Sequence, residues 1–304
     1  MTKAAALSAA LVLAPLAARA QGPDFDKVQV RTEKLAEGVH VLMGAGGNIG
    51  VSSGPDGVFL IDDEYAPLTP KVKAAVAALS DRPIRFLLNT HWHPDHTGGN
   101  ENLGEGGALI VAHDNVRRRM TTEQFIAAMG AKFPPAPARA LPVVTFDQAV
   151  TLHLNGDEIN AFHVAPAHTD GDAVVHFRRA NVLHLGDLFF NGMYPFVDLS
   201  SDGSFEGMIA ASDRALAIAD DRTRIIPGHG PVASRADLEA YRDMMAVVRD
   251  RVKPLVQAGR TAAQIAGARP LADLDERWGK GFMKPDVFLG IVVQSLTRAG
   301  NKPR

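Results

Sequence analysis

Four side chains that commonly bind metal ions lie within six consecutive residues: His91, His93, Asp95 and His96. They follow the apolar run 84–88, which has the length of a buried strand, so all four leave the end of that strand together. His91 and His93 are two residues apart, and on an extended backbone both rings point to the same side. A proline then bends the chain, so Asp95 and His96 can serve a second, adjacent position. A histidine-rich surface turn, the alternative, would not explain four ligand-type residues at these spacings.

The chemistry of these side chains narrows the choice of metal. Imidazole and carboxylate groups without a thiol suit Zn²⁺, with Mn²⁺ or Fe²⁺ as alternatives. Cysteine is absent from the 304 residues, which excludes disulfide bonds, thiolate ligands and a cysteine nucleophile. The formal net charge is -2 and no basic stripe stands out, so we expect a small-molecule substrate rather than a nucleic acid.

The first 20 residues have the pattern of a secretory signal peptide. A short positive start is followed by the apolar segment 4–16, which is too short to span a bilayer, and then by Ala18-Arg19-Ala20, an A-x-A cleavage signal. We therefore expect export to a bacterial periplasm or secretion, with no stable membrane insertion after cleavage. An uncleaved membrane anchor is the alternative. Residues 21–304 are then expected to form a single domain that ends in helices.

The rest of the chain predicts strands, then a helix, then more strands and more helices. This order favours sheets covered by helices in one α+β domain over alternating βα units. The strands are expected at 28–31, 39–43, 49–52, 58–61, 84–88, 108–112, 149–154, 159–164, 173–177, 182–185 and 224–226, and the helices at 70–79, 115–129, 204–219, 236–256 and from 261.

For some of the remaining segments the sequence predicts one role, and for others two roles remain open. Residues 44–48 read as a flexible glycine-rich turn, and the basic residues 117–119 as a solvated helix face. The proline-rich stretch 133–142 either borders the active site or is a plain connection. Trp92 and the pair 189–190 either line a substrate wall or pack in the core, and core packing is favoured.

Three further candidate ligands follow apolar runs and are flanked by glycine or proline: His168, Asp187 and His229. A single histidine in such a place is usually structural, but three such positions beside the first cluster favour a shared site. Asp62, at the end of a neighbouring strand, is a candidate hydrogen-bond partner for a metal-binding imidazole, or simply closes a turn. The other histidines are interpreted as structural: His40, His113, His153, His163, His176 and His184.

The order H-x-H-x-D-H, a lone histidine, G-D at a strand end and P-G-H-G resembles the metallo-β-lactamase-fold hydrolases. The segment 48–62 resembles the opening hairpins of that family, and the resemblance covers about residues 39–231. It implies a four-layer αβ/βα sandwich, with two sheets face to face and helices outside.

The resemblance also implies two metal positions. The first would be bound by His91, His93 and His168, the second by Asp95, His96 and His229, and Asp187 would bridge both. Aspartate at the bridging position differs from the β-lactamase branch that has cysteine there, and is similar to glyoxalase-II-type thioesterases and lactonases. Lactonases usually have a tyrosine where this chain has Phe190, which weakens that comparison.

The function implied is that of an exported di-zinc hydrolase. A metal-bridging hydroxide would cleave an amide, ester or thioester, including β-lactam-like or lactone-like rings. Asp95 is the candidate catalytic residue, because it could orient the nucleophile and accept its proton; a pure ligand role is the alternative. The alternative functions are a glyoxalase-II-like thioester hydrolase, a single-iron oxidoreductase of the same fold, and a metal- or ligand-binding protein without turnover.

Overall fold

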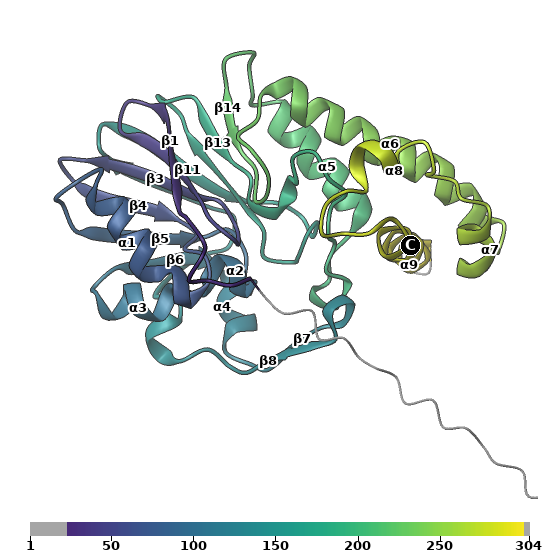
Figure 1. The fold of residues 1–304 in the computed structure, drawn as a ribbon, viewed down its shortest axis with the longest axis horizontal. Helices are drawn as coiled ribbons and strands as arrows, with labels where there is room; N and C mark the ends of the chain where they lie inside the picture. Colours follow the sequence, from purple (N-terminus) through teal and green to yellow (C-terminus); the bar gives the residue numbers. More distant parts are fainter. Residues whose placement is uncertain (1–22, 301–304) are drawn as a thin grey trace, which may run out of the picture.

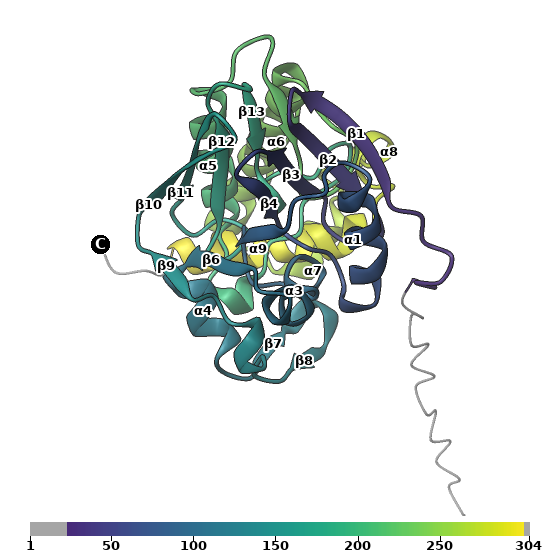
Figure 2. The same cartoon turned by 90° about the vertical axis from the view of Figure 1, so that its left-hand side faces the viewer.

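The computed structural model describes residues 23–300, and Figures 1 and 2 show two sheets packed face to face with helices outside them. The predicted signal peptide, residues 1–20, lies outside the described residues. Within residues 23–300, no helix is long and apolar enough to cross a membrane.

The first sheet has seven strands in the order β1-β2-β3-β4-β5-β6-β9. Neighbouring strands run antiparallel from β1 to β4 and parallel from β4 to β9. The strands are β1 Arg31–Ala36, β2 Val39–Met43, β3 Ile49–Gly54, β4 Gly57–Ile61, β5 Ile84–Asn89, β6 Leu109–His113 and β9 Val144–Phe146.

The second sheet has five strands in the order β10-β11-β12-β13-β14, and only the last pair is parallel. The strands are β10 Ala149–Leu154, β11 Asp157–His163, β12 Ala173–Phe177, β13 Val182–His184 and β14 Arg224–Ile226. A separate hairpin pairs β7 Gln124–Ile126 with β8 Ala131–Phe133.

The helices form two groups, one beside each sheet (Figure 1). The group beside the first sheet is α1 Thr69–Ala77, α2 Pro94–Thr97, α3 Asn100–Glu105 and α4 Asp114–Met120. The group beside the second sheet is α5 Phe205–Leu216, α6 Arg235–Gln257, α7 Ala262–Gly267, α8 Asp275–Trp278 and α9 Pro285–Gly300. The 3₁₀ turns are η1 Ala66–Leu68, η2 Ala127–Met129, η3 Ala138–Ala140, η4 Gly186–Leu188 and η5 Leu199–Ser201.

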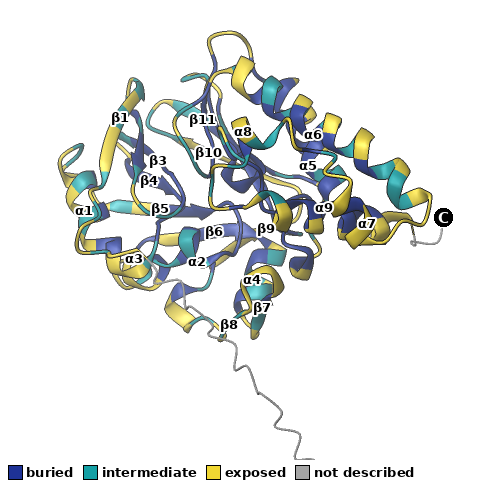
Figure 3. Cartoon of the chain, turned by 45° about the vertical axis from the view of Figure 1, so that its right-hand side comes forward, coloured by how far each residue is buried: buried dark blue, intermediate teal, exposed yellow. Residues whose placement is uncertain are grey.

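Side-chain alternation along the strands produces the layers. In β4, Phe59 and Ile61 belong to the core between the sheets, whereas Val58 and Leu60 belong to the core under α1. Both faces of this strand are therefore buried, which explains its continuous apolar sequence. A third core joins the outer face of the second sheet to α5, α6 and α9 (Figure 3). These layers confirm the predicted α+β four-layer sandwich.

The structure corrects the helix predicted over 115–129. The helix α4 ends at Met120, and the hairpin β7–β8 replaces the second half of the predicted element. Two β-branched threonines follow Met120, and the Thr121 hydroxyl donates to the carbonyl of Arg118, one of the carbonyls that the end of the helix leaves without an amide partner. Gly130 has a φ of 59°, as the turn of the hairpin requires. The predicted strand 28–31 was also placed too early, because β1 begins at Arg31.

Candidate metal centre

Strand ends from both sheets deliver the candidate ligands to one point. The segment with His91, His93, Asp95 and His96 follows β5, and α2 begins within it. In the second sheet, residues that follow β11, β13 and β14 supply the other side chains of the cluster, which are His168, Asp187 and His229. The structure thus brings all seven predicted residues together, in one group of four and one of three.

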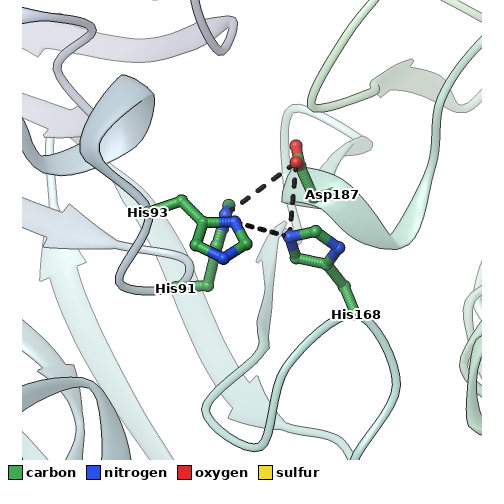
Figure 4. A group of neighbouring side chains, drawn as sticks. All are labelled: His91, His93, His168 and Asp187. Carbon is green, nitrogen blue, oxygen red and sulfur yellow. Dashed lines mark hydrogen bonds and ion pairs between the residues drawn. The ribbon is translucent and has the colours of Figure 1, made fainter. Parts of the chain in front are cut away.

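The group of four is almost fully buried and is shown in Figure 4. The Nδ1 atom of His93 lies 2.9 Å from Nε2 of His168. The Oδ2 atom of Asp187 lies 3.5 Å from that same Nε2 and 3.9 Å from Nε2 of His91. Four potential ligand atoms therefore surround one small volume.

The group of three lies on the other side of Asp187. The Oδ2 atom of Asp95 is 3.7 Å from Nε2 of His96 and 3.3 Å from Nε2 of His229. The second carboxylate oxygen of Asp187, Oδ1, is 3.1 Å from His96 Nε2 and 3.4 Å from His229 Nε2. Asp187 therefore offers one oxygen to each group, as a bridging ligand would.

Hydrogen bonds at the far side of the rings fix two of the imidazoles. Nδ1 of His96 lies 2.8 Å from Oδ2 of Asp62, and Nδ1 of His91 lies 3.1 Å from the Thr90 hydroxyl. That hydroxyl donates to Asp62, so it accepts from His91. In His91 the proton is on Nδ1 and the lone pair of Nε2 faces the cluster, and in His96 Nδ1 likewise donates while Nε2 faces the cluster. Of the two roles left open for Asp62, the structure shows that of a hydrogen-bond partner to a ligand imidazole.

The segment after Phe190 fixes the other two imidazoles, those of His93 and His168. The sequence alone did not predict this role. Nε2 of His93 lies 3.1 Å from the carboxylate of Asp198, and Nδ1 of His168 lies 2.8 Å from the carbonyl of Phe196. The Asp198 amide also donates to the carbonyl of His168. The sequence around Asp198 has a D-x-S pattern, and Asp198 caps η5. This pattern predicts a turn and does not predict a contact with His93.

These partners leave lone pairs directed at one another, which is unfavourable unless a cation lies between them. Nδ1 of His93 and Nε2 of His168 are both acceptors once their far nitrogens donate, and they are 2.9 Å apart. Within residues 23–300, buried Nε2 of His91 has no hydrogen-bond partner. Burial lowers the pKa of His91, and lowers that of His168 to about 4, so both rings are neutral. This donor set fits divalent metal ions.

Carboxylates dominate the electrostatics of the second group. Burial alone would lower the pKa of His96, but Asp187 and Asp95 outweigh it and raise this pKa well above its usual value. The same two carboxylates overcome burial and raise the pKa of His229 to about 10. The negative charge that holds protons on these rings is available to a bound cation instead.

Three consecutive acidic residues at the end of β4, Asp62, Asp63 and Glu64, are buried. Besides Asp62, Asp63 accepts a hydrogen bond from the amide of Gly99 at 2.9 Å, and Glu64 accepts one from the amide of Gly46 at 2.6 Å. Burial raises the pKa of Glu64 to about 7. The roles of Asp63 and Glu64 were not predicted, because both face backbone amides far away in sequence.

The glycine-rich turn 44–48 is held in place rather than flexible. The Gly47 amide donates to the carbonyl of Asp95, and the side chain of Asn48 donates to two carbonyls of the loop after β14. A Cβ atom on Gly47 would overlap the His96 ring, so glycine is required there by close approach.

The remaining predictions have mixed outcomes. Trp92 and Phe190 are buried, as core packing requires, but the Phe190 ring also stacks on His229 at 5.4 Å. The expected solvated face 117–119 is wrong at Arg119, which is part-buried and forms a bidentate pair with Asp170.

The other histidines lie outside both ligand groups. His113 and His163 stack at 3.7 Å, and His184 contacts the carbonyl of Asn48 at 3.0 Å. The full set outside the groups is His40, His113, His153, His163, His176 and His184.

Comparison with known proteins agrees with this architecture. The 2,4-dinitroanisole O-demethylase subunit alpha of Nocardioides sp. is 22% identical over 244 residues, which is 79% of this chain and 70% of the relative. A linear primary-alkylsulfatase of Pseudomonas sp. is 22% identical over 69% of this chain, which spans only 47% of that relative. A hydroxyacylglutathione hydrolase of Pelagibacter ubique is 25% identical over 52% of this chain and 58% of its own length.

Solved structures share the fold. A metallo-beta-lactamase from Pontibacter korlensis superposes with a TM-score of 0.57 at 19% identity, covering 72% of this chain and 99% of its own. A stereoselective inverting sec-alkylsulfatase from Pseudomonas sp. gives a TM-score of 0.68 at 17% identity, covering 89% of this chain and 50% of its own. The family model for the metallo-beta-lactamase superfamily matches residues 44–229, which include all seven clustered side chains. The chain therefore belongs to the metallo-beta-lactamase superfamily.

Proposed function

We propose that this protein is an exported di-zinc hydrolase that cleaves an amide, ester or thioester bond in a small substrate. The observation that carries the proposal is in the first group, where two acceptor nitrogens, Nδ1 of His93 and Nε2 of His168, lie 2.9 Å apart and buried Nε2 of His91 has no hydrogen-bond partner among residues 23–300. A protein that only needed these residues for packing would pair them with donors, because unpaired buried polar atoms are costly.

The two groups would hold one metal each. The first would be bound by His91, His93 and His168, the second by Asp95, His96 and His229, with Asp187 between them. When bound, two such metals supply Lewis acidity and lower the pKa of a water molecule toward neutrality.

Asp95 would act on the attacking water. Its side chain is 19% exposed and that of His229 is 17% exposed, whereas the first group is almost fully buried, so substrate would approach on this side. Nearby His96 and His229 outweigh burial and lower the pKa of Asp95 to about 2, so it is a carboxylate at neutral pH. It can therefore orient the water by accepting a hydrogen bond.

The candidate substrate classes rest on the N-terminal pattern, the fold and one relative. We place β-lactam-like and lactone-like rings first, because the N-terminal pattern suggests export and the fold is shared with a metallo-beta-lactamase. A glyoxalase-II-like thioester hydrolase is the second candidate, supported by the similarity to a hydroxyacylglutathione hydrolase. Zinc is proposed from the ligand types, with Mn²⁺ or Fe²⁺ as alternatives, and a single iron would instead support an oxidation.

Hydrolysis of a chromogenic β-lactam by the mature protein, with and without a chelator, tests this function. Turnover that the chelator abolishes and added zinc restores would support the proposal and place β-lactams among the substrates. If zinc-loaded protein does not cleave the β-lactam, lactones, esters and thioesters are assayed in the same way. Failure on all four classes would contradict the hydrolase proposal.

A further inference from the structure

The segment between α8 and α9 returns to the metal centre from outside the matched family region, which ends at residue 229. The helices at its two ends are anchored on Tyr194, whose amide donates to the carbonyl of Trp278 in α8 at 2.8 Å and whose hydroxyl donates to Asp275 in α8 at 3.0 Å. The ring of Tyr194 also stacks on Phe288 at 4.2 Å. These contacts fix the segment against the loop that follows Asp187.

Phe282 lies on this anchored segment and contacts the second ligand group. Its ring centroid is 5.9 Å from that of His229 and 5.7 Å from that of Phe190. Gly281 lies directly against Met193, where a Cβ atom would meet the methionine side chain, and this close approach positions the neighbouring phenyl ring.

The side chain of Phe282 is partly exposed although it packs beside the metal centre. It is 50% exposed, although the neighbouring Phe190 is completely buried. A single exposed apolar residue needs no explanation by itself. Phe282, however, contacts His229, which lies on the more exposed side of the metal centre. The free face of the ring therefore adds apolar surface beside the place where substrate would approach.

We propose that Phe282 is a specificity-determining residue that contacts an apolar group, aromatic or alkyl, next to the scissile bond. This inference rests on the proposed function, because it assumes that substrate binds at the two metal positions. Covering the free face of the ring removes apolar surface from water, which favours substrates with such a group over those without it.

The test compares two zinc-binding probes that differ only in their apolar group. Acetohydroxamate and benzohydroxamate are titrated into the zinc-loaded protein by calorimetry. Wild type is expected to bind benzohydroxamate more tightly. Phe282→Ala should weaken benzohydroxamate about 5- to 10-fold and change acetohydroxamate less than about twofold. Phe282→Leu should restore part of the loss, because it keeps an apolar side chain.

Val287→Ala is the matched control. Val287 is 47% exposed on the same part of the chain, within α9, and should change neither affinity. An unchanged acetohydroxamate affinity also shows that the Phe282 variants keep a folded metal site. Equal affinities of wild type for both probes, or an equal loss of both in Phe282→Ala, would overturn the role of Phe282 alone. Zinc-loaded wild type that binds neither probe would contradict the proposed binding of substrate at the two metal positions, and the role of Phe282 with it.

Discussion

At the scale of single residues, the centre depends on the partners that fix each imidazole. Four buried imidazoles each have one nitrogen that contacts a neighbouring residue and another that faces the cluster: His91, His93, His96 and His168. A ring that could rotate or change tautomer would present a proton instead of a lone pair to a metal. The site therefore depends on more than its ligands, because Asp62 orients the ring of His96 and Asp198 orients the ring of His93.

Asp198 provides the sharpest test at this scale. Replacing it with alanine removes the acceptor for His93 Nε2, so the ring can take the wrong tautomer or orientation. We expect zinc affinity to fall about 10- to 100-fold in Asp198→Ala, measured by competition with a chromophoric chelator. Asp198→Asn should lose less, since its amide oxygen can still accept.

The control for this change is Asp250→Asn, an exposed carboxylate on α6 that pairs with Arg249. It should leave zinc affinity unchanged. Normal zinc affinity in Asp198→Ala would show that packing alone orients His93.

Sequence could predict ligands but not most of their partners. The seven clustered residues belong to short motifs or strand ends, and Asp62 ends a strand beside them. Asp198 and the carbonyl of Phe196 reach the site only because the loop after η4 folds back over His168. The Asp198–His93 contact joins positions 105 residues apart and the Phe196–His168 contact joins positions 28 apart, and nothing in the local composition marks either of them.

At the scale of elements, strands that are buried on both faces were predicted well, because continuous apolar runs such as 58–61 leave few alternatives. The helix predicted over 115–129 was wrong in its second half. There the residues pair as a hairpin, and the Ser200 hydroxyl accepts the amide of Ala127. Long-range pairing outweighed helical periodicity in that segment.

The start of α4 gives a pH-dependent prediction. His113 caps this helix, because its Nδ1 accepts the amide of Asn115, and its ring stacks on His163. Burial, and then the nearby His163, lowers the pKa of His113 below 6.5. Below about pH 6.5 the unfolded chain therefore binds a proton that the native state excludes, and stability falls as pH decreases.

Urea unfolding of wild type and His113→Asn at pH 8 and pH 5.5 measures this effect. Asparagine can cap the helix without titrating in this range. We expect wild type to lose more unfolding free energy than the variant between the two pH values. An equal loss in both proteins would assign the pH dependence to other groups.

At the scale of the whole molecule, the centre joins the two halves of the sandwich. The segment with His91 comes from the first sheet, whereas Asp187 and His229 come from the second. No contiguous part of the chain holds both groups. Metal binding would therefore stabilise the association of the two sheets as well as enable catalysis.

The central claim is that seven side chains bind two metal ions with Asp187 between them. The most direct test is the zinc content per chain, measured by mass spectrometry of metals after dialysis, in wild type and in Asp187→Ala. We predict about two zinc ions per chain in wild type and a clear loss in the variant, since it removes an oxygen from each group. A wild type that binds one ion or none, or a variant that keeps two tightly bound ions, would contradict this account.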